Sequence, residues 1–254
     1  MKGESVKPVL VFDYDGTLHE TMRVYKPGIE AAVRWLRSEH GVEASMPSDQ
    51  RIKKWLGMNT SEMWEDFMPG LPPSLKAEAG KLVGRIMHEE IRAGHGRWYP
   101  GVKEKLNMLK EKGYTMVVLS NCEREYADLN REAFGMDWWF DAFYDCASFG
   151  YIAKEEIMKV VAADYGEKSG AQVPGFVVIG DRGSDYAAAK SVGAPFIWCA
   201  YGYGSREEFP EEGIFVIEDP VGPIPDDICR VIQEEYARIL GNSIAERNCP
   251  FFIY

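Results

Sequence analysis

Short apolar runs bounded by turn-forming residues recur along the chain, and each has the length of a buried strand. They lie at residues 9–12, 114–119, 142–146, 175–179 and 195–199. Stretches with helical periodicity separate most of these runs. Strands that alternate with helices are typical of a doubly wound α/β domain with a mainly parallel, Rossmann-like sheet.

The interval between the first and second runs breaks this alternation, because about a hundred residues pass there without another strand pattern. Helical patterns separated by Gly, Pro and Asn-Thr fill it, at 27–40, 48–56, 60–68 and 74–93. A further helix at 101–113 leads into the second strand. We therefore expect a helical domain at residues 19–97, inserted into an α/β core domain made of residues 1–18 and 98–254.

The C-terminal part of the chain contains one more amphipathic helix pattern, at residues 226–240, and ends in the apolar cluster CPFFIY. This end packs either on the core or against another subunit, so the sequence leaves the oligomeric state open.

Composition narrows the classes of partner. The 254 residues carry 29 Lys and Arg against 40 Asp and Glu, a net charge of −11, which opposes binding to nucleic acid and to anionic membrane surfaces. No run approaches the roughly 20 apolar residues of a membrane-spanning helix, and the N-terminus has no signal-peptide pattern. The five cysteines are scattered without a C-x-x-C pair, which favours reduced thiols in a cytosolic protein.

Polar and charged side chains follow four of the predicted strands. They are Asp13, Asp15, Ser120, Asn121, Lys154, Asp181 and Asp185. In an open parallel sheet the ligand crevice lies beyond the carboxyl ends of the strands, so we expect these side chains to converge on one sheet edge.

Clustered carboxylates need a cation, because unpaired negative charges a few ångström apart raise one another's pKa. A set of oxygen ligands without His or Cys favours Mg²⁺. A carboxylate beside this ion can attack phosphorus and form an aspartyl-phosphate, and a second acid two residues further on can exchange the proton. The sequence therefore predicts a magnesium-dependent phosphoryl-transfer site.

Four motifs in this order resemble the phosphatases of the haloacid dehalogenase superfamily: D-x-D-G-T at 13–17, Ser120-Asn121, Lys154, and G-D-x-x-x-D at 180–185. The helical insert is similar to the small α-helical cap domain of that family. The resemblance covers nearly all of residues 8–220. It is strongest to the phosphoglycolate phosphatase-like branch.

The resemblance implies a role for each matching residue in phosphoryl transfer. Asp13 would attack phosphorus, and Asp15 would act first as the acid and then as the base. Ser120, Asn121 and Lys154 would hold the phosphoryl group. The surroundings of Lys154 depart from the family's usual K-P-x-P sequence.

The resemblance also implies a Mg²⁺ site. The ligands would be the Asp13 carboxylate, the Asp15 backbone carbonyl and Asp181, with Asp185 either a ligand or a neighbour of the ligands.

Other interpretations of these residues stay open. Lys159 and Lys168 are alternatives to Lys154, and Ser120-Asn121 is also a common helix start that can cap a helix at 123–134. Asp181 and Asp185 also suit a helix N-terminus.

Three positions near the expected site carry their own interpretations. His19 either touches the substrate or is a solvated hinge residue, the interpretation we favour. Gly57 lies either in a cap loop that reaches the site or in a plain helix–helix turn. Trp138 and Trp139 are expected to bury their rings.

The leading hypothesis is a Mg²⁺-dependent phosphomonoester hydrolase that acts on a small phosphorylated metabolite. Asp15 argues against a true dehalogenase, which lacks the second acid in this family. Two alternatives remain: a phosphomutase of the same fold, and a catalytically silent protein that binds a phosphorylated ligand.

Overall fold

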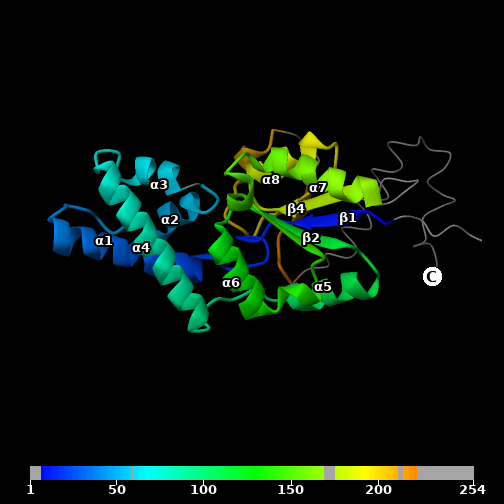
Figure 1. Ribbon diagram of the computed structural model, residues 1–254, viewed down its shortest axis with the longest axis horizontal. Coiled ribbons are helices and arrows are strands. Elements are labelled where there is room, and N and C mark those ends of the chain that lie inside the picture. The colour runs from blue at the N-terminus through cyan, green and yellow to red at the C-terminus, as the bar shows by residue number, and fades with distance from the viewer. Residues whose placement is uncertain (1–6, 59, 169–174, 211–213, 222–254) are drawn as a thin grey trace, which may run out of the picture.

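A six-stranded, fully parallel sheet forms the centre of the computed structural model, which describes residues 7–58, 60–168, 175–210 and 214–221 (Figure 1). The spatial order of its strands is β3-β2-β1-β4-β5-β6. Their bounds are β1 Val9–Phe12, β2 Met116–Ser120, β3 Ala142–Asp145, β4 Phe176–Gly180, β5 Phe196–Cys199 and β6 Phe215–Ile217. The parallel α/β fold predicted from the sequence is confirmed, and β6 is an addition to the five predicted strands.

Helices cover both faces of the sheet (Figure 1). On one face lie α5 (Val102–Glu111) and α6 (Arg124–Phe134), and on the other lie α7 (Lys154–Lys168) and α8 (Gly183–Ser191). Alternate residues of β1 join different cores: Leu10 and Phe12 pack with the α5 side, and Val9 and Val11 with the α7 and α8 side. The central strand is therefore buried on both faces.

Four helices between β1 and β2 form the cap domain, on the left in Figure 1. They are α1 (Met22–His40), α2 (Asp49–Trp55), α3 (Thr60–Phe67) and α4 (Pro73–Arg92). They enclose a hydrophobic cluster of their own, which includes the buried Trp55 and Trp64. A helical insert is thus confirmed, while its proposed limits of 19 and 97 stay a prediction.

Helix α1 begins five residues earlier than predicted, and Pro27 lies inside it. The chain tolerates this proline because packing fixes the preceding turn, where Val24 is fully buried. Gly28 allows α1 to approach α4 closely, since a Cβ there would lie 2.9 Å from the carbonyl oxygen of Val83. Tertiary contact therefore decides where this helix begins.

The two chain segments that join cap and core lie side by side. Backbone hydrogen bonds link Glu20 N to Arg97 O (2.8 Å) and Tyr99 N to Leu18 O (2.9 Å). Their neighbours His19 and Trp98 form an antiparallel bridge. The cap is therefore attached through a short paired segment.

The two tryptophans that precede β3 differ in burial. Trp138 is 64% exposed, so the prediction that its ring is buried is wrong; Lys110 Nζ lies 4.8 Å from the centre of that ring. Trp139 is partly buried against the core. The helix predicted at 226–240 and the apolar end of the chain lie outside the described residues.

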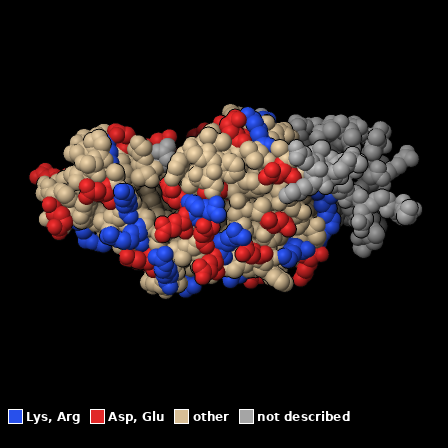
Figure 2. All heavy atoms as spheres, viewed as in Figure 1, with Lys and Arg blue, Asp and Glu red and all other residues tan. Residues whose placement is uncertain are grey.

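The surface carries both signs of charge. Lys and Arg side chains are intermingled with Asp and Glu on the face shown in Figure 2. Within the described ranges, every helix is too short or too polar to cross a membrane. Cys122, Cys146 and Cys199 are free thiols, and the other two cysteines lie outside those ranges.

Candidate active site

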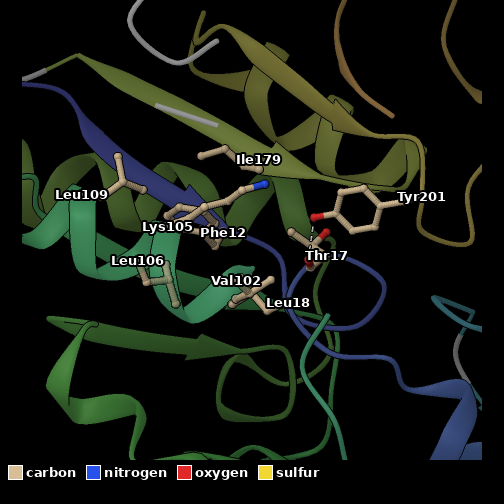
Figure 3. Close-up of a pocket in the computed structure, with 9 residues that line it drawn as sticks. All are labelled: Phe12, Thr17, Leu18, Val102, Lys105, Leu106, Leu109, Ile179 and Tyr201. Atoms are coloured by element: carbon tan, nitrogen blue, oxygen red, sulfur yellow. Dashed lines mark hydrogen bonds between the residues drawn. The ribbon is translucent and has the colours of Figure 1, made fainter. Parts of the chain in front are cut away.

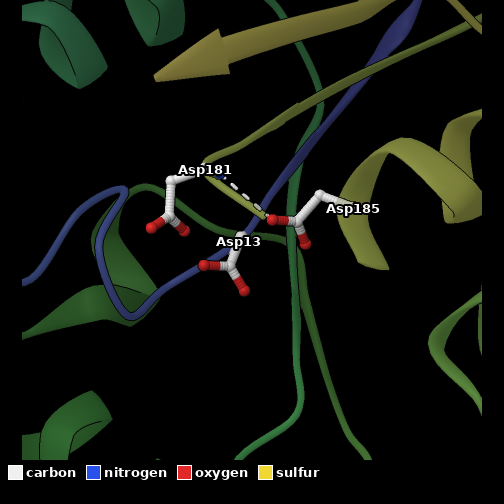
Figure 4. A group of neighbouring side chains, drawn as sticks. All are labelled: Asp13, Asp181 and Asp185. Atoms are coloured by element: carbon white, nitrogen blue, oxygen red, sulfur yellow. Dashed lines mark hydrogen bonds between the residues drawn. The ribbon is translucent and has the colours of Figure 1, made fainter. Parts of the chain in front are cut away.

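The alternation of β1 places Asp13 on the α7 and α8 side of the sheet. Asp13 directly follows the strand and is buried, as are Asp181, which follows β4, and Asp185, on the first turn of α8. One carboxylate oxygen from each of these aspartates lies within 4.8 Å of the others. Figure 4 shows the three carboxylates gathered around one space at the carboxyl edge of the sheet.

The buried ammonium of Lys154 holds two of these acids. Its Nζ donates to Asp13 Oδ1 at 2.6 Å and to Asp185 Oδ1 at 2.5 Å, and the residue is 3% exposed. Lys154 is the first residue of α7, so the helix that covers this sheet face also delivers the cation. Of the two alternative lysines, Lys159 is exposed and paired with Glu156, and the side chain of Lys168 lies outside the described part of the chain.

Asp181 is enclosed by two turns in which glycine lies directly against its carboxylate. Its Oδ2 accepts the backbone N–H of Tyr203 at 2.6 Å. A Cβ at Gly16, where φ is +91°, would lie 2.3 Å from that oxygen, and a Cβ at Gly202 would lie 2.5 Å from it. These approaches are too close for any side chain, so both glycines are needed for the observed position of Asp181.

Asp185 has two sets of partners. Its Oδ2 accepts the backbone N–H groups of Asp181 (3.1 Å) and Arg182 (2.9 Å), which completes a capping arrangement at the start of α8. Its Oδ1 faces Lys154. Asp185 therefore both caps the start of α8 and lies in the acidic cluster, so the two interpretations are compatible.

The electrostatics of the cluster favour a bound cation. Burial, followed by the charge of Asp185, raises the pKa of Asp13 to about 7. Burial and the charges of Asp13 and Asp185 raise the pKa of Asp181 well above its ordinary value. Burial alone would lower the pKa of Lys154, but the Asp13 and Asp185 carboxylates outweigh it and raise that pKa.

The residues present fit Mg²⁺. Asp181 Oδ1 is buried and has no hydrogen-bond partner among the described residues. A buried, unpaired carboxylate oxygen is costly unless a cation contacts it. The donors are all carboxylate oxygens, and such hard ligands suit magnesium better than they suit softer metals.

The carboxylate of Asp15 lies apart from the three clustered acids. Its Oδ1 accepts the hydroxyl of Thr21 at 2.5 Å and the phenol of Tyr126 at 2.9 Å. The strand ends at Phe12 and the chain turns after Asp15, so strand alternation does not continue this far. The two acids of the D-x-D motif therefore have different hydrogen-bond partners.

The second motif lies at the end of β2, next to β1 in the sheet. Ser120 is buried, and its backbone carbonyl accepts from Cys146 N at 3.1 Å. Asn121 is exposed, and its carbonyl accepts from Cys146 Sγ at 2.9 Å. Helix α6 has Glu123 at its N-cap without a side-chain capping bond, so the helix-cap interpretation of Ser120-Asn121 is wrong.

A cap loop reaches the acidic site. The guanidinium of Arg182, the residue after Asp181, donates through Nη1 to the carbonyl of Leu56, and through Nε to Glu208 at 3.0 Å. Gly57 adopts φ +93°, and a Cβ there would lie 2.9 Å from Arg182 Nη1. The loop around Gly57 therefore contacts the core directly beside the carboxylates.

A small cavity lies on the opposite face of β1, lined mainly by apolar residues of β1 and α5 (Figure 3). Its volume of about 10 Å³ is room for one water molecule. At its edge the Tyr201 hydroxyl donates to the carbonyl of Thr17 at 2.8 Å, which anchors the turn after Asp15. This cavity is too small for a substrate, and it lies on the face of β1 opposite the acidic cluster.

The motifs can now be compared with known proteins. A family model described as haloacid dehalogenase-like hydrolase matches residues 8–193. The chain belongs to this family. The match includes β1, β2, β3 and β4 and the whole acidic cluster, which confirms the family resemblance found in the sequence.

Curated relatives and solved structures agree with this assignment. A phosphoglycolate phosphatase of Haemophilus influenzae (strain 86-028NP) is 31% identical over 76% of this chain and 85% of that protein. A "probable phosphatase IndB" of Dickeya dadantii (strain 3937) is 24% identical over 84% and 90% of the two chains. The crystal structure of a predicted phosphoglycolate phosphatase from Haemophilus somnus 129pt shares the fold, with a TM-score of 0.71 at 21% identity over 91% of this chain and 100% of that one.

Several residues of the site were absent from the sequence-based prediction. Thr21 and Tyr126 bond to Asp15, and Tyr203 and Arg182 support or flank Asp181. The glycines of the segment AYGYGSREEF were a usable signal for the loop around Asp181. His19 is fully buried, so the prediction of a solvated hinge residue there is wrong.

Proposed function

We propose that this enzyme is a Mg²⁺-dependent phosphomonoester hydrolase that acts on a small phosphorylated metabolite. The observation that carries the proposal is the buried Asp13 carboxylate, held by Lys154 and placed within 4.8 Å of Asp181 and Asp185. An aspartate so placed can act as a nucleophile beside a cation site, at the carboxyl ends of the strands, where open parallel sheets bind their ligands.

In the proposed first step Asp13 attacks phosphorus, the bond from phosphorus to the leaving oxygen breaks, and an aspartyl-phosphate forms. Asp15 protonates the leaving oxygen, so the product departs as an alcohol. Lys154 neutralises charge on the phosphoryl oxygens, and Ser120 and Asn121 donate to them.

In the second step Asp15, now a carboxylate, removes a proton from water, and that water releases inorganic phosphate from Asp13. Mg²⁺, held by the carboxylates of Asp13 and Asp181 and by the Asp15 backbone carbonyl, with Asp185 adjoining, would reduce repulsion between nucleophile and phosphate. Closure of the helical cap over the site would exclude bulk water from the first step.

The relatives support a small phosphate ester as the substrate, because one of them is named phosphoglycolate phosphatase and is 31% identical. The contact of the Gly57 loop with Arg182 supports selection of the substrate by the cap. We therefore propose phosphoglycolate as the first substrate to test, followed by sugar phosphates and nucleotides.

The direct test replaces the nucleophile. We expect Asp13→Asn to lower the rate of 4-nitrophenyl phosphate hydrolysis by about 10³-fold or more, since an amide cannot form the covalent intermediate. Phosphate release with Mg²⁺ present measures the rate, and thermal unfolding checks the fold. Asp137→Asn is the matched control, because Asp137 is exposed and pairs with Arg131 away from the site.

Three outcomes would contradict the proposal. Full activity of Asp13→Asn would remove Asp13 as the nucleophile. Transfer of the phosphoryl group between two positions of a sugar phosphate, without release of inorganic phosphate, would identify a mutase. A broad panel of esters that bind but are not hydrolysed would identify a binding protein.

A further inference from the structure

His19 is the one buried histidine beside the D-x-D motif, and the proposed mechanism gives it no role. Its side chain is completely buried. The ring stacks on Tyr14, with centroids 5.2 Å apart and planes 12° apart, and Phe134 meets it edge-on at 5.6 Å. These two aromatic contacts fix the plane of the imidazole.

The two ring nitrogens have different surroundings. Nδ1 lies 3.0 Å from Thr21 Oγ1 and 3.3 Å from the Tyr126 hydroxyl. Nε2 is buried with no hydrogen-bond partner among the described residues, and Gly96 packs against it, since a Cβ there would lie 3.2 Å away. A proton on Nε2 would have no acceptor, whereas a proton on Nδ1 has the Thr21 and Tyr126 oxygens within reach, so we place the proton on Nδ1.

A proton on Nδ1 sets the direction of the next hydrogen bond. The Nδ1–H donates to Thr21 Oγ1 and occupies a lone pair of that hydroxyl. The Thr21 hydroxyl then donates its own hydrogen to Asp15 Oδ1, at 2.5 Å. The same direction holds for the imidazolium form, because Nδ1 is a donor in both.

Two donors thus converge on a single oxygen of Asp15, because the Tyr126 phenol also donates to Oδ1, at 2.9 Å. An oxygen that already accepts two hydrogen bonds is a poor site for a proton. The other oxygen, Oδ2, is left to carry the proton that an acid must deliver. The orientation of the carboxyl group is fixed at the same time.

We infer that His19 is a positioning residue for Asp15: through Thr21, it directs the transferable proton to Asp15 Oδ2. This inference depends on the proposed function, because it assigns a task to the acid of that mechanism. In the step concerned, the bond from phosphorus to the leaving oxygen breaks, and the proton moves from Asp15 Oδ2 to that oxygen.

The test compares two substrates with different leaving groups, because a positioning role affects them unequally and a packing role affects them equally. The leaving group 4-nitrophenolate departs without being protonated, whereas an alkoxide must be protonated as it departs. Only the alkyl ester, phosphoglycolate, therefore needs the acid. The value of kcat/KM reports the steps up to departure of the leaving group, and hydrolysis of the aspartyl-phosphate does not enter it. The two substrates are 4-nitrophenyl phosphate and phosphoglycolate, with Mg²⁺ present.

Two substitutions differ in the atom they keep. In His19→Asn the side-chain amide nitrogen takes the place of Nδ1, and in His19→Gln it takes the place of Nε2. We expect His19→Gln to lower kcat/KM for phosphoglycolate by about 10²-fold, the smaller end of general-acid effects, and for 4-nitrophenyl phosphate by much less. We expect His19→Asn to keep the phosphoglycolate value within about tenfold of the wild type, because it keeps the donor.

Thr21→Val and Thr21→Ser provide a second pair if both His19 variants lose stability in thermal unfolding. Valine keeps the shape and removes the hydroxyl, so we expect the same selective loss, while serine retains activity on both substrates. His40→Gln is the control for a histidine change elsewhere, because His40 is exposed at the end of α1 and contacts Trp35. It should leave both values unchanged.

The outcomes are distinguishable. Equal losses on the two substrates in His19→Gln and Thr21→Val, or no loss on either, would overturn the positioning role and leave the proposed function intact. If the wild type does not hydrolyse phosphoglycolate, a sugar phosphate or nucleotide that it does hydrolyse serves as the alkyl ester. A wild-type protein that hydrolyses none of these esters would overturn the proposed function and the positioning role with it.

Discussion

Asp181 occupies a space that two glycines leave open, and this makes its position sensitive to a single methyl group. A Cβ at Gly202 would lie 2.4 Å from the Asp181 Cβ and 2.6 Å from the Gly16 carbonyl oxygen. We expect Gly202→Ala to displace the carboxylate and to raise the Mg²⁺ concentration for half-maximal activity by about tenfold or more, as loss of a ligand's support does at metal sites. Titration of phosphate release with Mg²⁺ measures this.

Gly84→Ala is the matched control for that change. Gly84 lies in α4, and its Cβ would meet no heavy atom within 4 Å. It should leave the magnesium titration unchanged and stabilise the helix by about 0.5–1 kcal/mol. An unchanged magnesium titration in Gly202→Ala would show that the loop can move away from Asp181.

Polar site residues that directly follow a strand could be predicted from the sequence. The residues from distant parts of the chain that bond to them could not. Asp13 and Asp181 each come immediately after an apolar run, which is a local pattern. The phenol of Tyr126 reaches Asp15 from 111 residues further along the chain, and its helix showed only ordinary amphipathic spacing. His19 was expected to be a solvated hinge residue, but the rings of Tyr14 and Phe134 pack against its buried imidazole.

Helices α2 and α8 come from different domains, and Arg182 connects them. Its planar guanidinium bonds at once to the Leu56 carbonyl at the end of α2 and to Glu208 in the core. Lysine keeps the charge but cannot hold both partners in this fork geometry. We expect Arg182→Lys to speed amide hydrogen exchange of the α2–α3 segment roughly tenfold, because loss of one charged hydrogen bond lowers the local opening free energy by about 1.5 kcal/mol. We also expect it to lower kcat/KM.

Arg85→Lys serves as the control for this arginine change. Arg85 is exposed on α4 and lies 4.0 Å from Glu89, so its replacement should alter neither exchange nor activity. Exchange at residues 56–58 that is equal in Arg182→Lys and wild type would mean that other contacts hold the loop against the core.

The described strands and helices whose bounds were predicted lie within a few residues of those bounds, whereas β6 and the first turn of α1 were missed for a shared reason. The strand β6 has only three residues and lies at the sheet edge, so its apolar signal is short. The first turn of α1 precedes a proline that reads as a helix start. In both places pairing or packing with distant residues determines the structure, and local pattern carries little of that information.

Stability of the complete protein should respond to pH and Mg²⁺ together. The pKa of Asp13 is raised from 3.8 to about 7 in the folded metal-free protein. The unfolded chain therefore releases this proton first, and the stabilising contribution, full below pH 3.8, is lost as the pH rises toward about 7. Mg²⁺ favours the carboxylate, so we expect saturating Mg²⁺ to raise the unfolding temperature more at pH 8 than at pH 6.

Thermal unfolding at both pH values, with Mg²⁺ and with a chelator, measures these increments. In Asp13→Asn the position no longer titrates, so the difference between the two pH values should shrink. The same increment at pH 6 and pH 8 in the wild type would contradict the assignment of Asp13 as a magnesium ligand that must lose a proton.

The paired crossing between core and cap, where Glu20 meets Arg97, has a consequence for how such an enzyme changes over evolutionary time. Because the two ends of the insert already adjoin, the core needs little additional loop entropy to accept a longer, shorter or unrelated insert at this point. The acids and the lysine lie in the core, and the Thr21 hydroxyl that donates to Asp15 is the contact that a new insert would have to supply again. With that contact kept, the proposed selectivity of the cap and the chemistry of the core can change separately.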